Sequence, residues 1–504
     1  MTLLSRIFGL LRDITLATLF GASGGTDAFL VAFKIPNFMR RLFAEGAFSQ
    51  AFVPVFSEYK EKRPEQLKDL IDHVAGTLGG ILLGIAIIGS LGAPVLVAIF
   101  GPGFLANRPE DYQLTVDMLH ITFPYLFFIA LVAFAGGILN SYHKFAVAAF
   151  TPVLLNLVMI SAAIWLAPQF DQPLMALAWG VFAAGVVQLL FQVPSLAKLK
   201  MLPIPRFDLA HEGVRKIMRL MLPAIVGSSV AQINLLLDTI IASFLVAGSV
   251  TWLYYSDRLL EFPLGVLGIA AATVILPALS QHHARESREE FNHTLNWAVR
   301  LVVVVSVPAC AGLFYLAAPV LASLFQYGAF DANDTYMASL SLMAYMIGLP
   351  AFILIKVLAP GYYARQDTKT PVKIGIIAMV ANMVLNLCFV LALIEIEFEA
   401  VHVGLALATT LSAYINAILL YRGLRADDTF VPEAGWMKLG LQIVVATAFM
   451  VMMVHLMMPP ADWWNLQPAL ERVLQLMVLI LFGLAAYIGA LMATGVKADT
   501  FRQS

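Results

Sequence analysis

The sequence predicts an all-α integral membrane protein with about 14 transmembrane helices. Hydrophobic residues make up 60% of the 504-residue chain and charged residues only 12%, whereas soluble chains carry about 25% charged residues. Apolar runs of about 20 residues, enough to cross a bilayer, recur along the whole sequence, for example at 81–100 and 474–494. The loops between them are too short for a large soluble domain.

Apolar runs bounded by polar breaks place the expected helices in order along the chain. They cover residues 2–20, 26–57, 72–100, 112–141, 147–167, 173–197, 214–246, 250–280, 290–318, 335–363, 371–394, 402–424, 436–457 and 470–494. The N-terminus lacks the charged segment and small-residue cleavage site of a secretory signal, so we expect the first span to be retained.

Lysine and arginine are distributed unevenly between the loops. Even-numbered loops, the C-terminal tail and the adjoining helix ends hold most of them, whereas only Arg108 and Arg472 lie in or beside odd-numbered loops. Because positive charge favours the cytoplasmic side of a membrane, we expect both termini in the cytoplasm. That orientation requires an even number of helices.

A weak internal repeat with a period of about 225 residues relates the two halves of the chain. Repeats of this kind are common in transporters, which bind substrate between the halves. We therefore expect an N-lobe at 1–200, a C-lobe at 201–428 and two additional helices at 429–504. The matching pairs are Gly25 with Gly248, Pro54 with Pro277, Ser57 with Ser280, Pro124 with Pro350, and Asn156 with Asn382.

The first two spans carry unusual charge for helices in a bilayer. A central arginine or lysine costs about 2.5–3.5 kcal/mol on insertion scales, so such residues mark functional sites or internal ion pairs. Asp27, Lys34 and Arg41 recur every seven residues and fall on one helical stripe. The cations are Arg6, Arg12, Lys34, Arg40 and Arg41, and the acids are Asp13, Asp27 and Glu45.

Two interpretations of this charged region remain open. One is a water-filled cationic chamber, with Pro36 and Gly46 bending the second helix around it. The other is a self-neutralised structural network with the pairs Arg41–Glu45 and Arg12–Asp27. The excess of cations over acids favours the chamber.

The eighth span repeats the theme with Asp257, Arg258 and Glu261. A local Arg258–Glu261 ion pair is one interpretation, since the residues lie one helical turn apart. The other is that Arg258 is a second-half ligand for the substrate of the chamber. Arginine suits a diphosphate because its planar fork donates hydrogen bonds in pairs and stays charged. Lys356 is a weaker candidate for the same lining.

A separate polar group lies in spans 7 and 11. Asp238, Asn382 and Asn386 supply oxygen ligands that suit Na⁺, or a proton on Asp238 alone. Thr409 or Thr410 is a further candidate ligand. The alternative is hydrogen bonding between helices, which membrane bundles use routinely.

Enzyme and cofactor signals are missing from the sequence. It contains no P-loop and no H-x-x-x-H pair, so we expect a transporter driven by an ion gradient or the membrane potential. Cys310 and Cys388 lie inside apolar runs and are expected to be core side chains. No nucleic-acid partner is indicated.

Several motifs together resemble the MurJ/MviN lipid II flippases. They are Ser5-Arg6-Ile7-Phe8-Gly9-Leu10-Leu11-Arg12-Asp13, Thr26-Asp27-Ala28-Phe29, Phe33-Lys34-Ile35-Pro36-Asn37, Arg40-Arg41-Leu42-Phe43-Ala44-Glu45-Gly46-Ala47-Phe48, Asp257-Arg258-Leu259-Leu260-Glu261-Phe262-Pro263, and Lys356-Val357-Leu358-Ala359-Pro360-Gly361-Tyr362-Tyr363-Ala364-Arg365-Gln366-Asp367. The resemblance covers essentially the whole chain. The chain begins almost at the first motif, without the short leader of many family members.

The resemblance implies the fold of the multidrug/oligosaccharidyl-lipid/polysaccharide exporter superfamily, with two six-helix lobes and two extra helices that form a lipid groove. It implies that lipid II, a polyprenyl-diphosphate-linked muropeptide, is flipped across the bacterial inner membrane by alternating access. By motif, the family's important charges fall on Arg6, Arg12, Asp27, Arg40 and Arg258. Some members bind sodium in a place similar to Asp238, Asn382 and Asn386.

Three functions are compatible with these observations. The first is a lipid II flippase with a substrate site formed by Arg6, Arg12, Asp27, Lys34, Arg40, Arg41, Arg258 and Glu261. Within it, Asp27 would orient an arginine or gate the portal. The second is a drug/cation antiporter, which the net positive first spans disfavour, or a flippase for another polyprenyl-diphosphate glycan. The third is a scaffold for cell-wall enzymes; the peptidoglycan synthesis machinery is also an expected partner of a flippase.

Overall fold

The computed structural model describes residues 2–41, 48–265 and 269–496, and these residues form helices and loops without a strand. They divide by their contacts into two compact units, Met1–Thr251 and Trp252–Ser504. The all-α class predicted from the sequence is confirmed.

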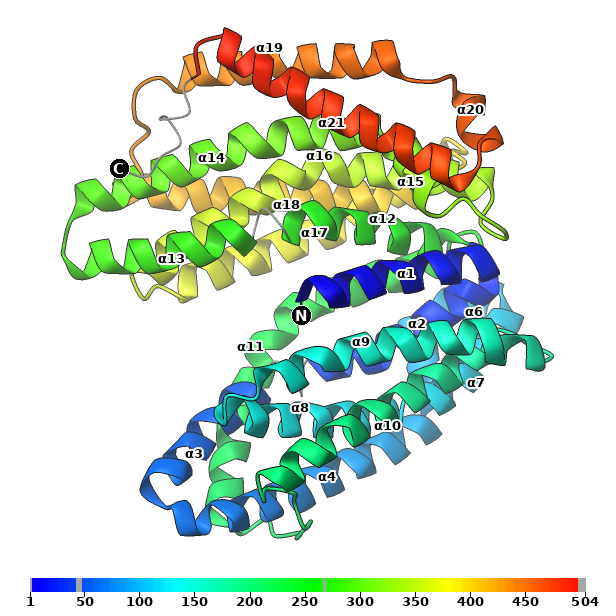
Figure 1. The fold of residues 1–504 in the computed structure, drawn as a ribbon, viewed down its shortest axis with the longest axis vertical. Coiled ribbons are helices and arrows are strands. Elements are labelled where there is room, and N and C mark those ends of the chain that lie inside the picture. Colours follow the sequence, from blue (N-terminus) through cyan, green and yellow to red (C-terminus); the bar gives the residue numbers. More distant parts are fainter. Residues whose placement is uncertain (1, 42–47, 266–268, 497–504) are drawn as a thin grey trace. The chain divides into compact units, whose positions relative to one another are not determined.

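The helices of the first unit run in chain order and are coloured blue to green in Figure 1. They are α1 (Thr2–Phe20), α2 (Gly24–Arg40), α3 (Ser49–Lys62), α4 (Leu67–Leu91), α5 (Ala93–Phe100), α6 (Pro102–Asn107), α7 (Pro109–Thr122), α8 (Tyr125–Ser141), α9 (Phe145–Ser161), α10 (Met175–Lys198) and α11 (Glu212–Ala242).

Aromatic packing forms the core beside α3, α4 and α8. Phe48, Phe52 and Phe56 recur at every fourth position, so they project from one face of the chain. Phe134 of α8 meets Phe52 edge-on with ring centroids 5.1 Å apart. Elsewhere in the unit α1 packs on α9, and α2 packs on α7 and α8. These contacts fix α1 and α2, which carry the charges, within the first unit.

The second unit is built around α16. This helix begins at a capping box, in which the Asp331 side chain accepts the Asp334 amide and Asp334 reaches back to the Asp331 amide. The helices are α12 (Ser249–Pro263), which starts in the first unit, then α13 (Ile269–Ala284), α14 (Arg288–Tyr315), α15 (Ala317–Leu324), α16 (Ala332–Tyr363), α17 (Lys369–Glu395), α18 (Val403–Ala426), α19 (Trp436–Met457), α20 (Ala461–Leu466) and α21 (Ala469–Ala493).

Ten helices within the described residues are long and apolar enough to cross a membrane, so this is a multi-pass membrane protein. They correspond to ten of the spans expected from the sequence. The other expected spans, 2–20, 26–57, 214–246 and 250–280, are largely helical where the structure describes them. These four spans are not among the ten, because they carry several charged side chains or include residues outside the described part of the chain. The count of about 14 transmembrane helices therefore stays a prediction.

The contact boundary between the units lies after α11, whereas the sequence repeat places a lobe boundary at 200/201. In the structure α11 packs on α3, α4, α5 and α6. A boundary defined by contacts between helices does not test a boundary defined by sequence similarity between the two halves. The lobes at 1–200 and 201–428, with helices added at 429–504, therefore stay a prediction.

Candidate substrate-binding site

Arg12 is the most deeply buried of the predicted substrate-binding cations in the described chain, with 5% of its surface exposed. Its Nη2 donates to Asp13 Oδ1 at 2.6 Å, and its Nε donates to the same oxygen at 3.0 Å. Its Nη1 donates to Asn156 Oδ1 of α9 at 3.1 Å. Asn156 in turn donates to the Ser5 carbonyl at 3.3 Å, which secures α1 against α9. The guanidinium is therefore held rigidly beside one carboxylate.

Asp27 is fully buried and ties three segments of the first unit together. Its carboxylate accepts the Gly248 amide at 2.8 Å, the Thr251 amide at 2.9 Å and the Thr251 hydroxyl at 2.7 Å. Arg108 donates to it at 3.2 Å and to the Ser243 carbonyl at 3.3 Å. The Arg12–Asp27 pair considered from the sequence is therefore replaced by Arg12–Asp13 and Arg108–Asp27. Asp27 holds the start of α12 and the end of α11 against α2.

The remaining cations of α1 and α2 have different environments. Lys34 donates to the Thr239 hydroxyl of α11 at 2.5 Å. Arg40 is partly exposed and donates to Asn37 Oδ1 at 2.8 Å. Arg6 is exposed, and Arg41 is partly exposed at the end of α2. Glu45, the predicted partner of Arg41, and Gly46, one of the two residues predicted to bend the helix, lie outside the described residues, whereas Pro36 lies inside α2.

Arg258 belongs to the second unit, on α12, and forms the local ion pair considered from the sequence. Its Nη1 donates to Glu261 Oε2 at 3.0 Å, and its Nε donates to the Tyr254 hydroxyl at 3.2 Å. The Arg258 side chain is 37% exposed and that of Glu261 is 50% exposed. The Arg258 side chain is therefore only partly covered by protein. Lys356 on α16 is also exposed.

The predicted ion ligands are shared between the units. Asn386 donates to Asn382 Oδ1 at 3.1 Å, and Asn382 donates to the Thr409 hydroxyl at 3.3 Å. Thr410 instead donates to the Ala344 carbonyl of α16 at 2.8 Å, so Thr409 is the threonine on the asparagine side. Asp238 lies on α11 of the first unit. The sodium site stays a prediction.

An apolar groove of about 640 Å³ lies between α14 and α19 in the second unit. One of its polar contacts is a hydrogen bond of 2.5 Å between the Tyr315 hydroxyl and His455 Nδ1. The groove is lined by Val307, Tyr315, Val444, Thr447, Ala448, Val451, Met452 and His455. Its apolar lining suits a hydrocarbon chain.

Sequence reasoning missed the partners of the charged residues, namely Asn156 for Arg12, Thr239 for Lys34 and Arg108 for Asp27. One signal was available, because Arg108 and Arg472 are the exceptions to the loop charge pattern. Arg472, like Arg108, binds distant parts of the chain together. It donates hydrogen bonds to the carbonyls of Gln467, Ala322, Gln326 and Asn465.

Comparisons with known proteins agree along almost the whole chain. The model of the family described as "Lipid II flippase MurJ" matches residues 16–465. The chain is 48% identical to the "Probable lipid II flippase MurJ" of Haemophilus influenzae, over 99% of this chain and 98% of that protein. It is 42% identical to the "Lipid II flippase MurJ" of Burkholderia cenocepacia, over 100% of this chain and 97% of that one.

Solved structures show the same architecture. A structure described as "Lipid II flippase MurJ, inward closed conformation" superposes with a TM-score of 0.80 at 28% identity, covering 97% of this chain and 96% of that one. An inward-facing multidrug transporter of the MATE family and MOP superfamily superposes with a TM-score of 0.68 at 15% identity, covering 84% of this chain and 95% of that one. The second likeness concerns the fold alone.

Proposed function

Because the chain belongs to the lipid II flippase MurJ family, a family of transporters and not of enzymes, we propose that it moves lipid II from the cytoplasmic to the periplasmic leaflet of the inner membrane. The observation that carries this proposal is the family match along the full chain, together with the buried cation Arg12 in its first helix.

The diphosphate of lipid II is held by the arginines in this proposal. Arg12 is pre-organised by Asp13 and Asn156, and Arg258 is only partly covered by protein. Arg6, Lys34, Arg40 and Arg41 extend the positive field of α1 and α2. Glu261 keeps Arg258 in place until the diphosphate displaces it, since a bidentate phosphate contact is stronger than an exposed ion pair.

The polyprenyl tail lies in the groove between α14 and α19. The groove is apolar along nearly its whole lining, so an isoprenoid chain needs no polar partner there. The head and the tail of the substrate are then handled by different parts of the protein, which suits a lipid whose headgroup alone must cross the bilayer.

The transport cycle in this proposal is alternating access, powered by the membrane potential or a cation gradient. The Asp27 contacts to Gly248, Thr251 and Arg108 act as a latch that holds the start of α12 to α2. Release of this latch frees the start of α12 to move. Both termini face the cytoplasm, because the lysine- and arginine-rich loops belong on that side.

The test is the exposure of lipid II at the outer leaflet. Cells are depleted of the protein and then restored with wild-type protein, and the fraction of lipid II that an external lipid II-cleaving enzyme reaches is measured. We expect exposure to fall on depletion and return on restoration. If the exposure of lipid II at the outer leaflet does not change on depletion, the protein is not the flippase, and a scaffolding role would be favoured instead.

A further inference from the structure

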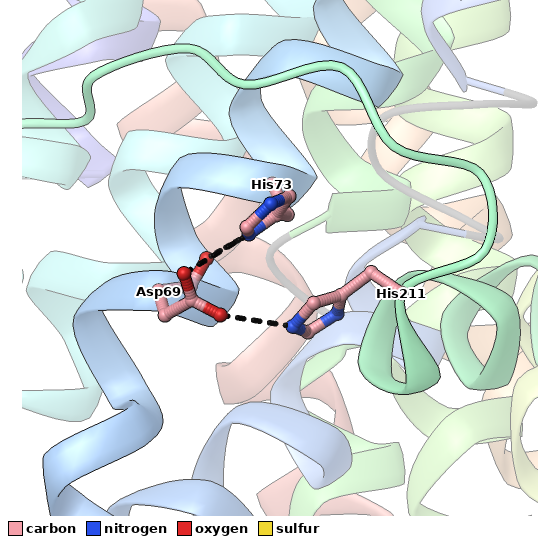
Figure 2. Close-up of side chains that lie close together, drawn as sticks. All are labelled: Asp69, His73 and His211. Carbon is pink, nitrogen blue, oxygen red and sulfur yellow. Dashed lines mark hydrogen bonds and ion pairs between the residues drawn. The ribbon is translucent and has the colours of Figure 1, made fainter.

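A cluster of one carboxylate and two imidazoles lies on the first unit, away from the charges of α1 and α2. Asp69 and His73 are one turn apart on α4, and His211 precedes α11 (Figure 2). We propose that this cluster is a binding site for a divalent transition-metal ion such as Zn²⁺, and that the bound ion fastens the start of α11 to α4.

The donor set and its spacing support a metal site. Asp69 Oδ2 is 3.2 Å from His211 Nε2, and Asp69 Oδ1 is 3.3 Å from His73 Nδ1. In a tetrahedron with zinc bonds of about 2.0–2.1 Å, neighbouring ligand atoms are about 3.3 Å apart. One donor atom from each of the three residues lies within 4.8 Å of the other two. The two short distances end on different oxygens of Asp69, so the three side chains must draw together before one carboxylate oxygen and both imidazoles can share an ion. Two imidazoles and one carboxylate are ligands that zinc and its neighbours prefer.

The connection from α10 to α11 presents His211 to α4 in a fixed register. The Ile204 amide donates to Asp72 Oδ1 at 2.7 Å, and the Arg206 amide donates to the Asp72 carbonyl at 3.0 Å. The Asp208 amide donates to the Thr77 hydroxyl at 3.0 Å. A Cβ at Gly76 would lie 2.3 Å from the Arg206 backbone, so this glycine allows the close approach. The third ligand is thus delivered by a segment already bonded to the helix of the other two.

The hydrogen bonds of the cluster define what changes when a metal binds. His211 Nδ1 accepts the Gly213 and Val214 amides at 3.2 and 3.4 Å, so Nε2 carries the ring proton and donates it to Asp69. Coordination through His211 Nε2 moves that proton to Nδ1 and releases both amide bonds. His73 Nδ1 donates to the Asp69 carbonyl at 2.9 Å, so coordination through this atom moves its proton to Nε2 and releases that bond. The two rings are stacked, 4.6 Å apart at 13°, and the released His211 ring can tilt so that the ion lies in both ring planes.

Arg206 competes with the metal for Asp69. Its Nη1 is 3.6 Å from Asp69 Oδ1, and its side chain is 59% exposed. A dication at Asp69 repels the guanidinium, which is free to swing into solvent. Removal of this charge therefore strengthens metal binding, an effect opposite to the loss of an ordinary stabilising ion pair.

The second unit offers a matched control. His293 Nδ1 is 2.9 Å from Glu433 Oε1, and Arg300 Nη1 is 3.4 Å from Glu433 Oε2. This trio has an imidazole, a carboxylate and an arginine, as at Asp69. Within the described residues it lacks the second imidazole.

The experiment is a Zn²⁺ titration of the purified full chain by calorimetry, with melting temperatures measured in parallel. His211→Asn is the main variant, because asparagine preserves the N-cap of α11 while removing the imidazole. We expect one Zn²⁺ per wild-type chain, at least about tenfold weaker binding in His211→Asn and His73→Ala, severalfold tighter binding in Arg206→Gln and no change in His293→Ala. Zn²⁺ should raise the melting temperature of the wild type and not that of His211→Asn.

Equal Zn²⁺ affinity in the wild type and His211→Asn, with His211→Asn melting normally without metal, would overturn the proposal. So would an equal loss of binding in His293→Ala. Neither result would bear on lipid II transport.

Discussion

Arg12 of the first unit and Arg258 of the second are the same residue type in opposite environments. Arg12 has a side-chain exposure of 6% and bonds to Asp13 and Asn156, whereas the side chain of Arg258 is 37% exposed and pairs with Glu261 one turn away. A buried pair is costly to break, and an exposed pair contributes about 0–1 kcal/mol to stability. Loss of transport after substitution is therefore expected to come with loss of stability at Arg12, and without it at Arg258.

The largest effect is expected for Arg12→Ala. This change leaves the Asp13 carboxylate buried without its guanidinium, which costs about 3–5 kcal/mol when a buried pair is broken. The melting temperature of the purified protein should fall and transport should be lost. A melting temperature equal to that of the wild type would show that Arg12 contributes little to the fold.

The double variant Arg12→Gln/Asp13→Asn separates the role of Arg12 in stability from its role in transport. It removes both charges together and keeps hydrogen-bonding groups near Asn156, so most of the stability should return. Transport should stay lost, because no guanidinium remains to hold a diphosphate. Recovered transport in the double variant would assign Arg12 a structural role only.

The next effect is expected for Asp27→Asn. One amide oxygen cannot replace a carboxylate that accepts from Gly248, Thr251 and Arg108, so stability should fall by about 1–3 kcal/mol. Asp111, the other carboxylate beside Arg108, has an 18% exposed side chain and provides the control. Thermal melting should show a smaller shift for Asp111→Asn, and equal shifts would contradict the latch at Asp27.

Arg258→Ala should separate transport from stability. Loss of a partly exposed ion pair changes the free energy of unfolding by at most about 1 kcal/mol, while transport should be abolished. Arg258→Lys should rescue transport poorly, since lysine cannot donate in the bidentate geometry.

Arg365 is the matched control for Arg258. It pairs with Asp427 at 3.3 Å and lies 5.3 Å from the centre of the Tyr362 ring, the same distance as Arg258 lies from the centre of the Tyr254 ring. Arg365→Ala should keep transport, and equal losses would remove the special role of Arg258.

The smallest effect is expected at the asparagines of α17. If Asn382 and Asn386 bind Na⁺, the melting temperature of the wild type should be higher in a buffer containing Na⁺ than in one where choline replaces Na⁺, because a bound ligand stabilises the folded state. Asn382→Ala should abolish that increase. A sodium-dependent shift that survives Asn382→Ala would place the ion elsewhere.

The fold class followed from the sequence because membrane helices are specified by length and apolarity, which are local properties. Ten expected spans coincide with helices apolar enough to cross a membrane. The spans with buried charges, such as those containing Arg12 and Lys34, depend on tertiary partners, so hydropathy describes them poorly. Hydropathy and helical spacing alone did not identify the family; the longer sequence motifs in the first two spans and around Arg258 did.

The charged residues of interest could be found from the sequence, but most of their partners could not. Spacing on one helix indicated the Arg258–Glu261 pair, which forms. The Arg12–Asp27 pair, offered between two neighbouring spans, does not form. Asp27 is bound instead by groups at positions 108, 248 and 251 that only the tertiary fold brings together. The sequence did offer one indication of this partner, because Arg108 is a single cation in a loop that otherwise carries none.

The binding of lipid II by purified protein tests most directly whether guanidinium groups hold the diphosphate. Dissociation constants are measured for the wild type, Arg12→Gln/Asp13→Asn, Arg258→Ala and Arg365→Ala, each with its melting temperature. We predict binding at least about tenfold weaker for the first two variants, the equivalent of about 1.4 kcal/mol, and unchanged binding for Arg365→Ala. Wild-type affinity in a well-folded Arg12→Gln/Asp13→Asn protein would contradict the account.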